Sequence, residues 1–218
     1  MTDFSLNSVS IFPLTKSKPK KIIILCHGYG GDGKDISVLG INWQRFIPDA
    51  IFLCPNAPEI CVDNPTGYQW FDLRSSKEEI VLEKSLEAEK KLNKFIDKAL
   101  DNFNLNPKNL AIAGFSQGCM ISIQTALKKK EEISCVIGYS GKIINQNHLS
   151  KNINSKPKIL LVHGSDDTIV PPIHLLEAKE YLKKHSIKTQ TKMFKNCEHK
   201  IPVEGSSLGL TFLKKNLL

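Results

Sequence analysis

The chain has 218 residues and a formal net charge of +8, and this length suffices for one α/β domain with a full core. Lysine supplies nearly all of the positive charge, because Arg45 and Arg74 are the only arginines. A nucleic-acid site would favour arginine, which makes bidentate contacts. No run of residues resembles a membrane span or the apolar core of a signal peptide. We therefore expect one domain over residues 1–218, a cytoplasmic location and no nucleic-acid partner.

The lysines are spread over helical segments, with examples at 90–91, 128–130 and 183–184. The simpler interpretation is a solvated surface. The alternative is a weak attraction of the positive surface to anionic membranes or acyl phospholipids. The sequence does not indicate an oligomeric state.

Apolar, strand-like runs alternate with helical patterns along the chain. The five buried runs are 21–26, 50–54, 109–113, 134–139 and 157–163. Such alternation predicts an α/β fold with a mostly parallel central sheet and helices on both faces. Functional loops then follow the carboxyl ends of the strands. Residues 1–20 are polar, and we expect them to be irregular with at most an edge strand at 8–12.

The loop after the first buried run is rich in glycine, at Gly28, Gly30, Gly31 and Gly33. Glycine lets a backbone approach a ligand closely. The spacing matches neither the GxxxxGK[ST] nor the GxGxxG pattern of phosphate-binding loops. We therefore do not expect a nucleotide site at this loop.

The longest helix is predicted over 77–103. A capping box at 76–79 would begin it. Its apolar stripe consists of Ala88, Leu92, Phe95, Ile96, Ala99 and Phe103. The loop before this helix, residues 67–73, contains three aromatic side chains.

Residues Gly114-Phe115-Ser116-Gln117-Gly118 lie between a strand-like run and a helix-like run. A strand, a sharp turn with a serine and a helix form the nucleophile elbow of α/β-hydrolases. A strained backbone projects the serine hydroxyl, and side chains at the two glycine positions would clash. An ordinary glycine-rich turn is the alternative.

A serine nucleophile needs a base, and the base needs an acid that orients it. In this fold the three residues occur in the order Ser, Asp, His. Asp166 and Asp167 follow the run at 157–163, and His199 lies in the loop after a short strand at 189–194. His199 is therefore the candidate base, whereas spacing alone does not separate the adjacent aspartates.

Five other histidines are present. His27 and His163 precede glycines at predicted strand ends, and we interpret them as packed, hydrogen-bonded turn residues. The remaining three, His148, His174 and His185, lie in polar or helical surroundings and are expected at the surface.

The cysteines show no CxxC motif and no spacing typical of a metal site. They are Cys26, Cys54, Cys61, Cys119, Cys135 and Cys197. We interpret them as small apolar core residues in a reducing compartment.

Five segments in this order together resemble the phospholipase/carboxylesterase family of α/β-hydrolases, which includes the acyl-protein thioesterases. They are 27–33, 70–72, 114–118, 163–171 and 198–199, and the resemblance runs from about residue 20 to the C-terminus. It implies hydrolysis of carboxylic esters or thioesters of short to medium acyl chains, with no metal and no cofactor.

The resemblance also implies roles for single residues. Ser116 corresponds to the nucleophile, His199 to the base, and Asp167 rather than Asp166 to the acid. One oxyanion donor is the N–H of Gln117, directly after the nucleophile, and the resemblance selects the N–H of Tyr29 as the second.

Trp70 and Phe71 are interpreted, on the same resemblance, as a wall or lid of the acyl pocket. The alternative is that the aromatic side chains pin their loop to the core. Ile169 and Val170, next to Asp167 in the sequence, are further candidates for this pocket.

Two alternative functions stay open at this point. The protein could be a lysophospholipase that acts on longer acyl chains. It could also be a non-catalytic hydrolase fold that binds an acyl ligand or a partner.

Overall fold

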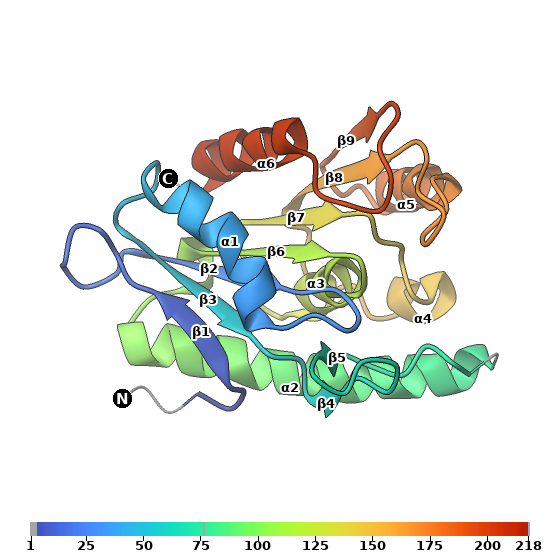
Figure 1. Cartoon of the computed structure of the whole chain (residues 1–218), viewed down its shortest axis with the longest axis horizontal. Coiled ribbons are helices and arrows are strands. Elements are labelled where there is room, and N and C mark those ends of the chain that lie inside the picture. The colour runs from blue at the N-terminus through green and yellow to red at the C-terminus, as the bar shows by residue number, and fades with distance from the viewer. Residues whose placement is uncertain (1–3, 76, 218) are drawn as a thin grey trace.

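A seven-stranded sheet forms the centre of the structure, a computed structural model that describes residues 4–75 and 77–217. The strand order is β1-β3-β2-β6-β7-β8-β9 (Figure 1). The strands are β1 (Ser8–Ile11), β2 (Lys21–Cys26), β3 (Ala50–Pro55), β6 (Leu110–Phe115), β7 (Cys135–Tyr139), β8 (Lys158–Gly164) and β9 (Thr189–Phe194). β1 pairs antiparallel with β3, and the other neighbours pair parallel. The carboxyl ends of the parallel strands therefore lie at one edge.

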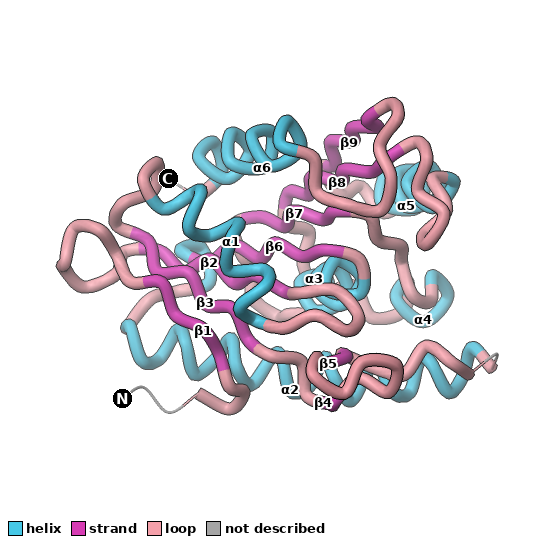
Figure 2. The backbone as a smooth tube through the Cα atoms, viewed as in Figure 1, coloured by secondary structure: helices cyan, strands magenta, loops and turns pink. Residues whose placement is uncertain are grey.

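Helices cover both faces of this sheet, as expected from the alternating pattern (Figure 2). One face packs against α1 (Gly33–Gln44) and α6 (Val203–Asn216). The other packs against α2 (Glu78–Phe103), α3 (Gln117–Lys128), α4 (Gln146–Ser150) and α5 (Ile173–Lys184). A 3₁₀ turn, η1 (Pro107–Asn109), precedes β6, and a small hairpin joins β4 (Glu59–Ile60) to β5 (Tyr68–Gln69).

Side-chain alternation along β2 explains why this strand is apolar from Ile22 to Cys26. Ile22 and Ile24 belong to the core cluster on the α2 and α3 side. Ile23 and Leu25 belong to the cluster on the α1 and α6 side. Successive side chains of a strand point to opposite faces, so a central strand of a sheet covered on both faces is buried at nearly every position. All five predicted runs are confirmed as strands.

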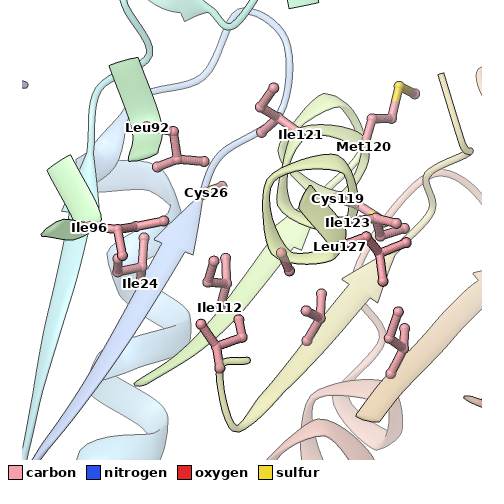
Figure 3. Packing of buried hydrophobic residues seen from close by; sticks show 14 of the residues in the cluster. Ile24, Cys26, Leu92, Ile96, Ile112, Cys119, Met120, Ile121, Ile123 and Leu127 are labelled. Atoms are coloured by element: carbon pink, nitrogen blue, oxygen red, sulfur yellow. The ribbon is translucent and has the colours of Figure 1, made fainter. Parts of the chain in front are cut away.

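The long helix α2 starts later than its predicted capping box requires. The box depends on Ser76, which lies outside the described residues, and the helix begins at Glu78 with Lys77 at the N-cap and no side-chain cap. The predicted apolar stripe is buried throughout. Leu92 and Ile96 from this stripe pack in one cluster with Ile24 of β2 (Figure 3). At the other end, Asn104 adopts a left-handed conformation that ends the helix.

The six cysteines are buried free thiols, as the sequence indicated. Burial raises the pKa of the Cys26 and Cys119 thiols to about 12, so both stay protonated near neutral pH. Residues 8–11 form the expected edge strand. In the part of the chain that the structure describes, no helix is both long and apolar enough to cross a membrane.

Candidate active site

Ser116 occupies the sharp turn between β6 and α3. Its backbone has φ 53° and ψ −118°, a region that residues other than glycine rarely adopt. The strand ends at Phe115 and the helix begins at Gln117, so a single residue makes the whole change of direction. Strained conformations of this kind persist where the surrounding structure fixes them, often at functional sites.

The two glycines of this turn allow three segments to meet. A Cβ atom on Gly114 would lie 2.2 Å from the carbonyl oxygen of Gly118, and one on Gly118 would lie 2.1 Å from that of Cys26. Both distances are far below van der Waals contact, and the atoms met belong to backbone. The predicted steric reason for the glycines is confirmed.

Asp167 and His199 form a close pair at the same edge of the sheet. His199 Nδ1 lies 2.7 Å from Asp167 Oδ2, and Asp167 is only 3% exposed. Asp166 is exposed, and its Oδ1 accepts a hydrogen bond from the hydroxyl of Ser165 instead. The geometry therefore separates the two aspartates that spacing could not separate.

Two hydrogen bonds donated by backbone N–H groups join the loop of Asp167 to the loop of His199. The N–H of Asp166 donates to the carbonyl of Cys197 over 2.9 Å, and the N–H of Asn196 donates to Ser165 Oγ over 3.0 Å. Asn196 has φ 51°, in the left-handed region that asparagine tolerates better than most residues. The loop after β9 thus turns back against the end of β8.

The Asp167 carboxylate is held in its ionised form. Burial alone would raise its pKa, but the hydrogen bond with His199 and those from the N–H groups of Val170 and Ile169 outweigh burial and lower the pKa. Both N–H groups donate to Oδ1, at 2.8 and 3.0 Å. Oδ2 is thereby left to face His199.

His199 lies beside the serine turn. Its ring centroid is 4.8 Å from that of Phe115, the residue before Ser116. Among the hydrogen bonds of the described residues, none involves Ser116 Oγ. In ligand-free enzymes the contact between nucleophile and base is often long and tightens when substrate binds.

The two expected oxyanion donors have unpaired N–H groups within the described ranges. Gln117 is the first residue of α3, where a backbone N–H has no partner within the helix. The backbone hydrogen bonds of the loop after β2 use Gly30 N and Gly31 N but leave out Tyr29 N. The hydroxyl of Tyr29 donates to Asp63, which ties this residue to the next loop.

Gln117 has a second role, in its side chain, that the sequence did not predict. The side-chain carbonyl accepts from the N–H of Trp70 over 2.8 Å, and the amide group donates to the carbonyl of Phe71 over 2.6 Å. The residue is fully buried. Gln117 therefore clamps the aromatic loop to the start of α3. A polar side chain of this length directly after the serine was the only signal for the clamp in the sequence.

Trp70 is packed in the core and is not among the residues that line the cavity beside Phe71. It is 0% exposed, and its indole N–H donates to the carbonyl of His27 over 3.0 Å. The alternative, an aromatic anchor that pins the loop to the core, describes this residue. Tryptophan fits such a place because a large apolar ring ends in one donor that finds an acceptor.

A cavity of about 200 Å³ borders the aromatic loop at Phe71 and Leu73. It is lined by Phe71, Leu73, Ser75, Glu78, Val81, Met120, Lys142 and Ile144. Phe71 borders this cavity, and its role in an acyl pocket stays a prediction. Ile169 is exposed and Val170 packs in the core, and neither is among these lining residues.

One residue of the cavity wall, Met120, lies on α3 close to the serine in sequence, although Ser116 itself is not among the lining residues. The N–H of Met120 donates to the carbonyl of Ser116 over 3.1 Å, so the two residues lie one helical turn apart. Phe71 is held by the side chain of Gln117. The cavity wall and the serine are therefore parts of one hydrogen-bonded unit.

The two buried histidines differ. His27 is the packed turn residue that we expected, with Nδ1 2.7 Å from the carbonyl of Gly28 and Nε2 accepting from the N–H of Ala57 over 2.9 Å. His163 is also packed, but its Nε2 lies 3.3 Å from Asp167 Oδ2. The interpretation of His163 as a packed turn residue therefore leaves out its contact with Asp167. The other three histidines are half-buried: His174 on α5, His185 at the C-cap of α5 and His148 on α4.

We expect the free energy of unfolding to fall as the pH drops below about 6.5, the ordinary pKa of histidine. Burial lowers the pKa of His27 and of His163 in the folded protein. Unfolding then releases each ring to take a proton, so stability is lost between about pH 6.5 and the lower folded values. The slope is at most about 1.4 kcal/mol per pH unit for each histidine. Urea unfolding at about pH 7 and about pH 5.5 measures it, and equal stability at both values would contradict the prediction.

No group of three histidine, cysteine, aspartate or glutamate residues within the described ranges is arranged to hold a metal ion.

The parallel sheet, the strained serine turn and the acid–histidine pair at the strand ends define an α/β-hydrolase. The model of the phospholipase/carboxylesterase family matches residues 11–217, and the chain belongs to this family. It is a serine hydrolase of the carboxylesterase and thioesterase type.

Individual relatives agree with this membership. Acyl-protein thioesterase 1 of Kluyveromyces lactis is 25% identical, with 97% of this chain and 98% of the relative covered. Acyl-protein thioesterase 1 of Aspergillus fumigatus is 30% identical over 73% of this chain and 72% of its own. The crystal structure of esterase PE8 superposes with a TM-score of 0.92 at 33% identity, covering 97% of this chain and 99% of that chain.

Proposed function

We propose that this protein cleaves carboxylic esters or thioesters of short to medium acyl chains through Ser116, His199 and Asp167, with an acyl-enzyme intermediate. The observation that carries the proposal is the 2.7 Å contact between Asp167 and His199, beside a serine in a strained turn. The acyl-protein thioesterases among the relatives support the thioester part of the proposal.

In this mechanism Ser116 Oγ attacks the acyl carbonyl carbon while His199 Nε2 takes the hydroxyl proton. His199 returns that proton to the leaving alcohol or thiol, and the acyl group stays on Ser116. Water then attacks the carbonyl carbon of the acyl-enzyme while His199 Nε2 takes a proton from it. His199 gives this proton to Ser116 Oγ as the bond to the acyl group breaks, and the carboxylic acid leaves. Asp167 holds the imidazole with its proton on Nδ1 and stabilises the imidazolium that forms in each step.

The negative charge that develops on the carbonyl oxygen needs donors that are in place beforehand. We propose the N–H groups of Gln117 and Tyr29 for this role. The start of α3 adds the positive end of a helix dipole at Gln117. Each donor of this kind contributes about 3–4 kcal/mol to the transition state.

We propose that the cavity beside Met120 takes the acyl chain. Five of its lining side chains are apolar: Phe71, Leu73, Val81, Met120 and Ile144. A volume of about 200 Å³ is below the range of roughly 300–1,000 Å³ that is typical of ligand pockets. The cavity therefore suits a short to medium acyl chain, for which we take about six carbons as the test length, better than the chain of a long-chain lysophospholipid.

A chain-length series tests this assignment. With p-nitrophenyl esters of two to twelve carbons, we expect kcat/KM to rise to about six carbons and then fall. Ile144→Trp should lower kcat/KM for the six-carbon ester by about 10-fold or more and leave the acetate ester nearly unchanged, because it fills the cavity. Leu176→Trp is a matched control, since Leu176 is exposed on α5. Equal loss for all chain lengths in Ile144→Trp would contradict the assignment.

The two alternative functions predict different results in the same series. A lysophospholipase would prefer the longest chains. A fold that only binds an acyl ligand would hydrolyse none of them. The surroundings of Asp167 favour a catalytic site over a fold that only binds. Two backbone N–H groups and the imidazole rings of His199 and His163 all face this one buried carboxylate.

We also propose that residues 1–218 form one domain and that the protein works in the cytoplasm. One continuous sheet with a core on each face supports the first statement. The six free thiols support a reducing compartment. Contact with anionic membranes stays a prediction from the charge of the chain.

A further inference from the structure

The imidazole of His163 has no part in the mechanism above, yet it touches the proposed acid. His163 is the sixth residue of β8 and is 2% exposed. Its Nε2 lies 2.8 Å from the carbonyl oxygen of Val170 and 3.3 Å from Asp167 Oδ2. Asp167 is therefore placed between two imidazole rings, those of His163 and His199.

The surroundings of Nε2 determine where the proton of His163 resides. The carbonyl of Val170 and the carboxylate of Asp167 only accept hydrogen bonds, so Nε2 must carry the proton. Burial lowers the pKa of His163, and the nearby rings of His199 and His174 act in the same direction, against the opposing effects of the Val170 carbonyl and Asp167. The ring is therefore neutral near neutral pH, with Nδ1 unprotonated.

His163 also closes the loop that carries the acid. The N–H of Val170 donates to Asp167 Oδ1 over 2.8 Å, while the carbonyl of Val170 accepts from His163 Nε2. Val170 is thus held at both polar groups of its backbone. The loop from Asp167 to Val170 cannot turn without breaking one of these contacts.

The contacts divide the carboxylate into two sides with different tasks. Oδ1 accepts from the N–H groups of Ile169 and Val170. Oδ2 faces His199 Nδ1 and His163 Nε2. A neutral N–H near Oδ2 stabilises the ionised carboxylate. It also weakens the electrostatic attraction between this carboxylate and a protonated His199.

We propose that His163 is a positioning residue that acts through Asp167. Its neutral Nε2–H donates to the carbonyl of Val170 and so holds the loop whose N–H groups orient the carboxylate, and the same Nε2–H places a partial positive charge 3.3 Å from Oδ2. The inference rests on the proposed function, because Asp167 matters for turnover only if His199 is the base. The role is distinct from that of a packed turn residue, since a turn residue would leave the protonation of the base unaffected.

Two substitutions separate these roles in the full-length protein. His163→Leu removes the N–H, and we expect kcat/KM to fall by about 10- to 100-fold, as for a small misplacement of a catalytic group. The acid limb of its kcat/KM profile should also move to higher pH, because Oδ2 then offers its full charge to protonated His199. His163→Gln keeps a neutral N–H donor, so its acid limb should stay near the native position.

An unshifted acid limb in His163→Leu would overturn the inference, even if activity falls, because lost packing lowers turnover equally at all pH values. An equal shift in both variants would overturn it as well. Activity of the native protein on a p-nitrophenyl ester is measured in parallel. Its absence would contradict the proposed function rather than the role of His163.

A measurement on the native protein does not depend on how the variants fold. With ¹⁵N-labelled histidine, NMR reports the tautomer of each ring. We expect His163 to be neutral with the proton on Nε2 throughout the pH range in which the enzyme works. A proton on Nδ1, or a second proton in that range, would overturn the inference.

Discussion

Replacing Ser116 by alanine is expected to lower kcat for ester hydrolysis by about 10⁴-fold or more. The variant keeps the cavity, the Asp167–His199 pair and the oxyanion donors, but no atom remains to form the acyl-enzyme. Residual hydrolysis would come from water activated in the same site. A p-nitrophenyl ester of four to six carbons is a suitable substrate, because it has the chain length that we propose for the cavity.

Ser122→Ala is a matched control for this experiment. Ser122 lies on α3 as well, and its hydroxyl donates to the carbonyl of Gly118 over 2.6 Å. We expect this variant to keep most of the activity, since it loses one buried hydrogen bond worth about 1 kcal/mol and no reacting atom. A serine-reactive fluorophosphonate probe should label the native protein and Ser122→Ala but leave Ser116→Ala unlabelled. Labelling of Ser116→Ala would identify another nucleophile.

Much of the fold was predictable because its signals are local. The runs that became β2, β3, β6, β7 and β8 are short and continuously apolar, and helical patterns separate them. A strand buried on both faces has few polar positions, so its sequence is easily recognised. The serine turn was recognised for a similar reason, since each of its two glycines is required by a backbone atom close by.

Contacts between distant segments were not predictable in the same way. Gln117 bonds to Trp70 and Phe71, more than 40 positions away. His163 meets Asp167 only because the loop after β8 turns back on its strand. No periodicity reports such contacts, so the sequence offered only a polar residue beside the serine and a histidine before a glycine.

The aromatic loop shows how residue type alone can mislead. Trp70 and Phe71 are adjacent and similar in character, and the sequence suggested one role for both. In the structure Trp70 is an anchor under the loop, whereas Phe71 borders the cavity. Adjacent residues of an irregular segment point in different directions, and which one meets a ligand depends on the packing of the whole loop.

Exchanging each of the two adjacent aspartates for asparagine should give opposite results. In Asp167→Asn the side-chain oxygen can still accept from the N–H groups of Ile169 and Val170, so the loop keeps its shape. The amide group then faces His199 Nδ1 and favours the wrong tautomer of the imidazole. We expect kcat to fall by about 10⁴-fold, as for the equivalent change in a Ser-His-Asp triad.

Asp166→Asn should leave most of the activity. The side chain of Asp166 is exposed and, among the residues that the structure describes, accepts a hydrogen bond from Ser165 alone. An amide oxygen can replace that acceptor. The contribution of Asp166 to the site is its backbone N–H, which holds the carbonyl of Cys197 in the loop of His199, and the substitution keeps this group. Because the two changes are chemically identical and one position apart, a difference in kcat between them reports the position of the carboxylate alone. A large loss in Asp166→Asn with an active Asp167→Asn would assign the acid to Asp166 and would require the two loops to rearrange when substrate binds.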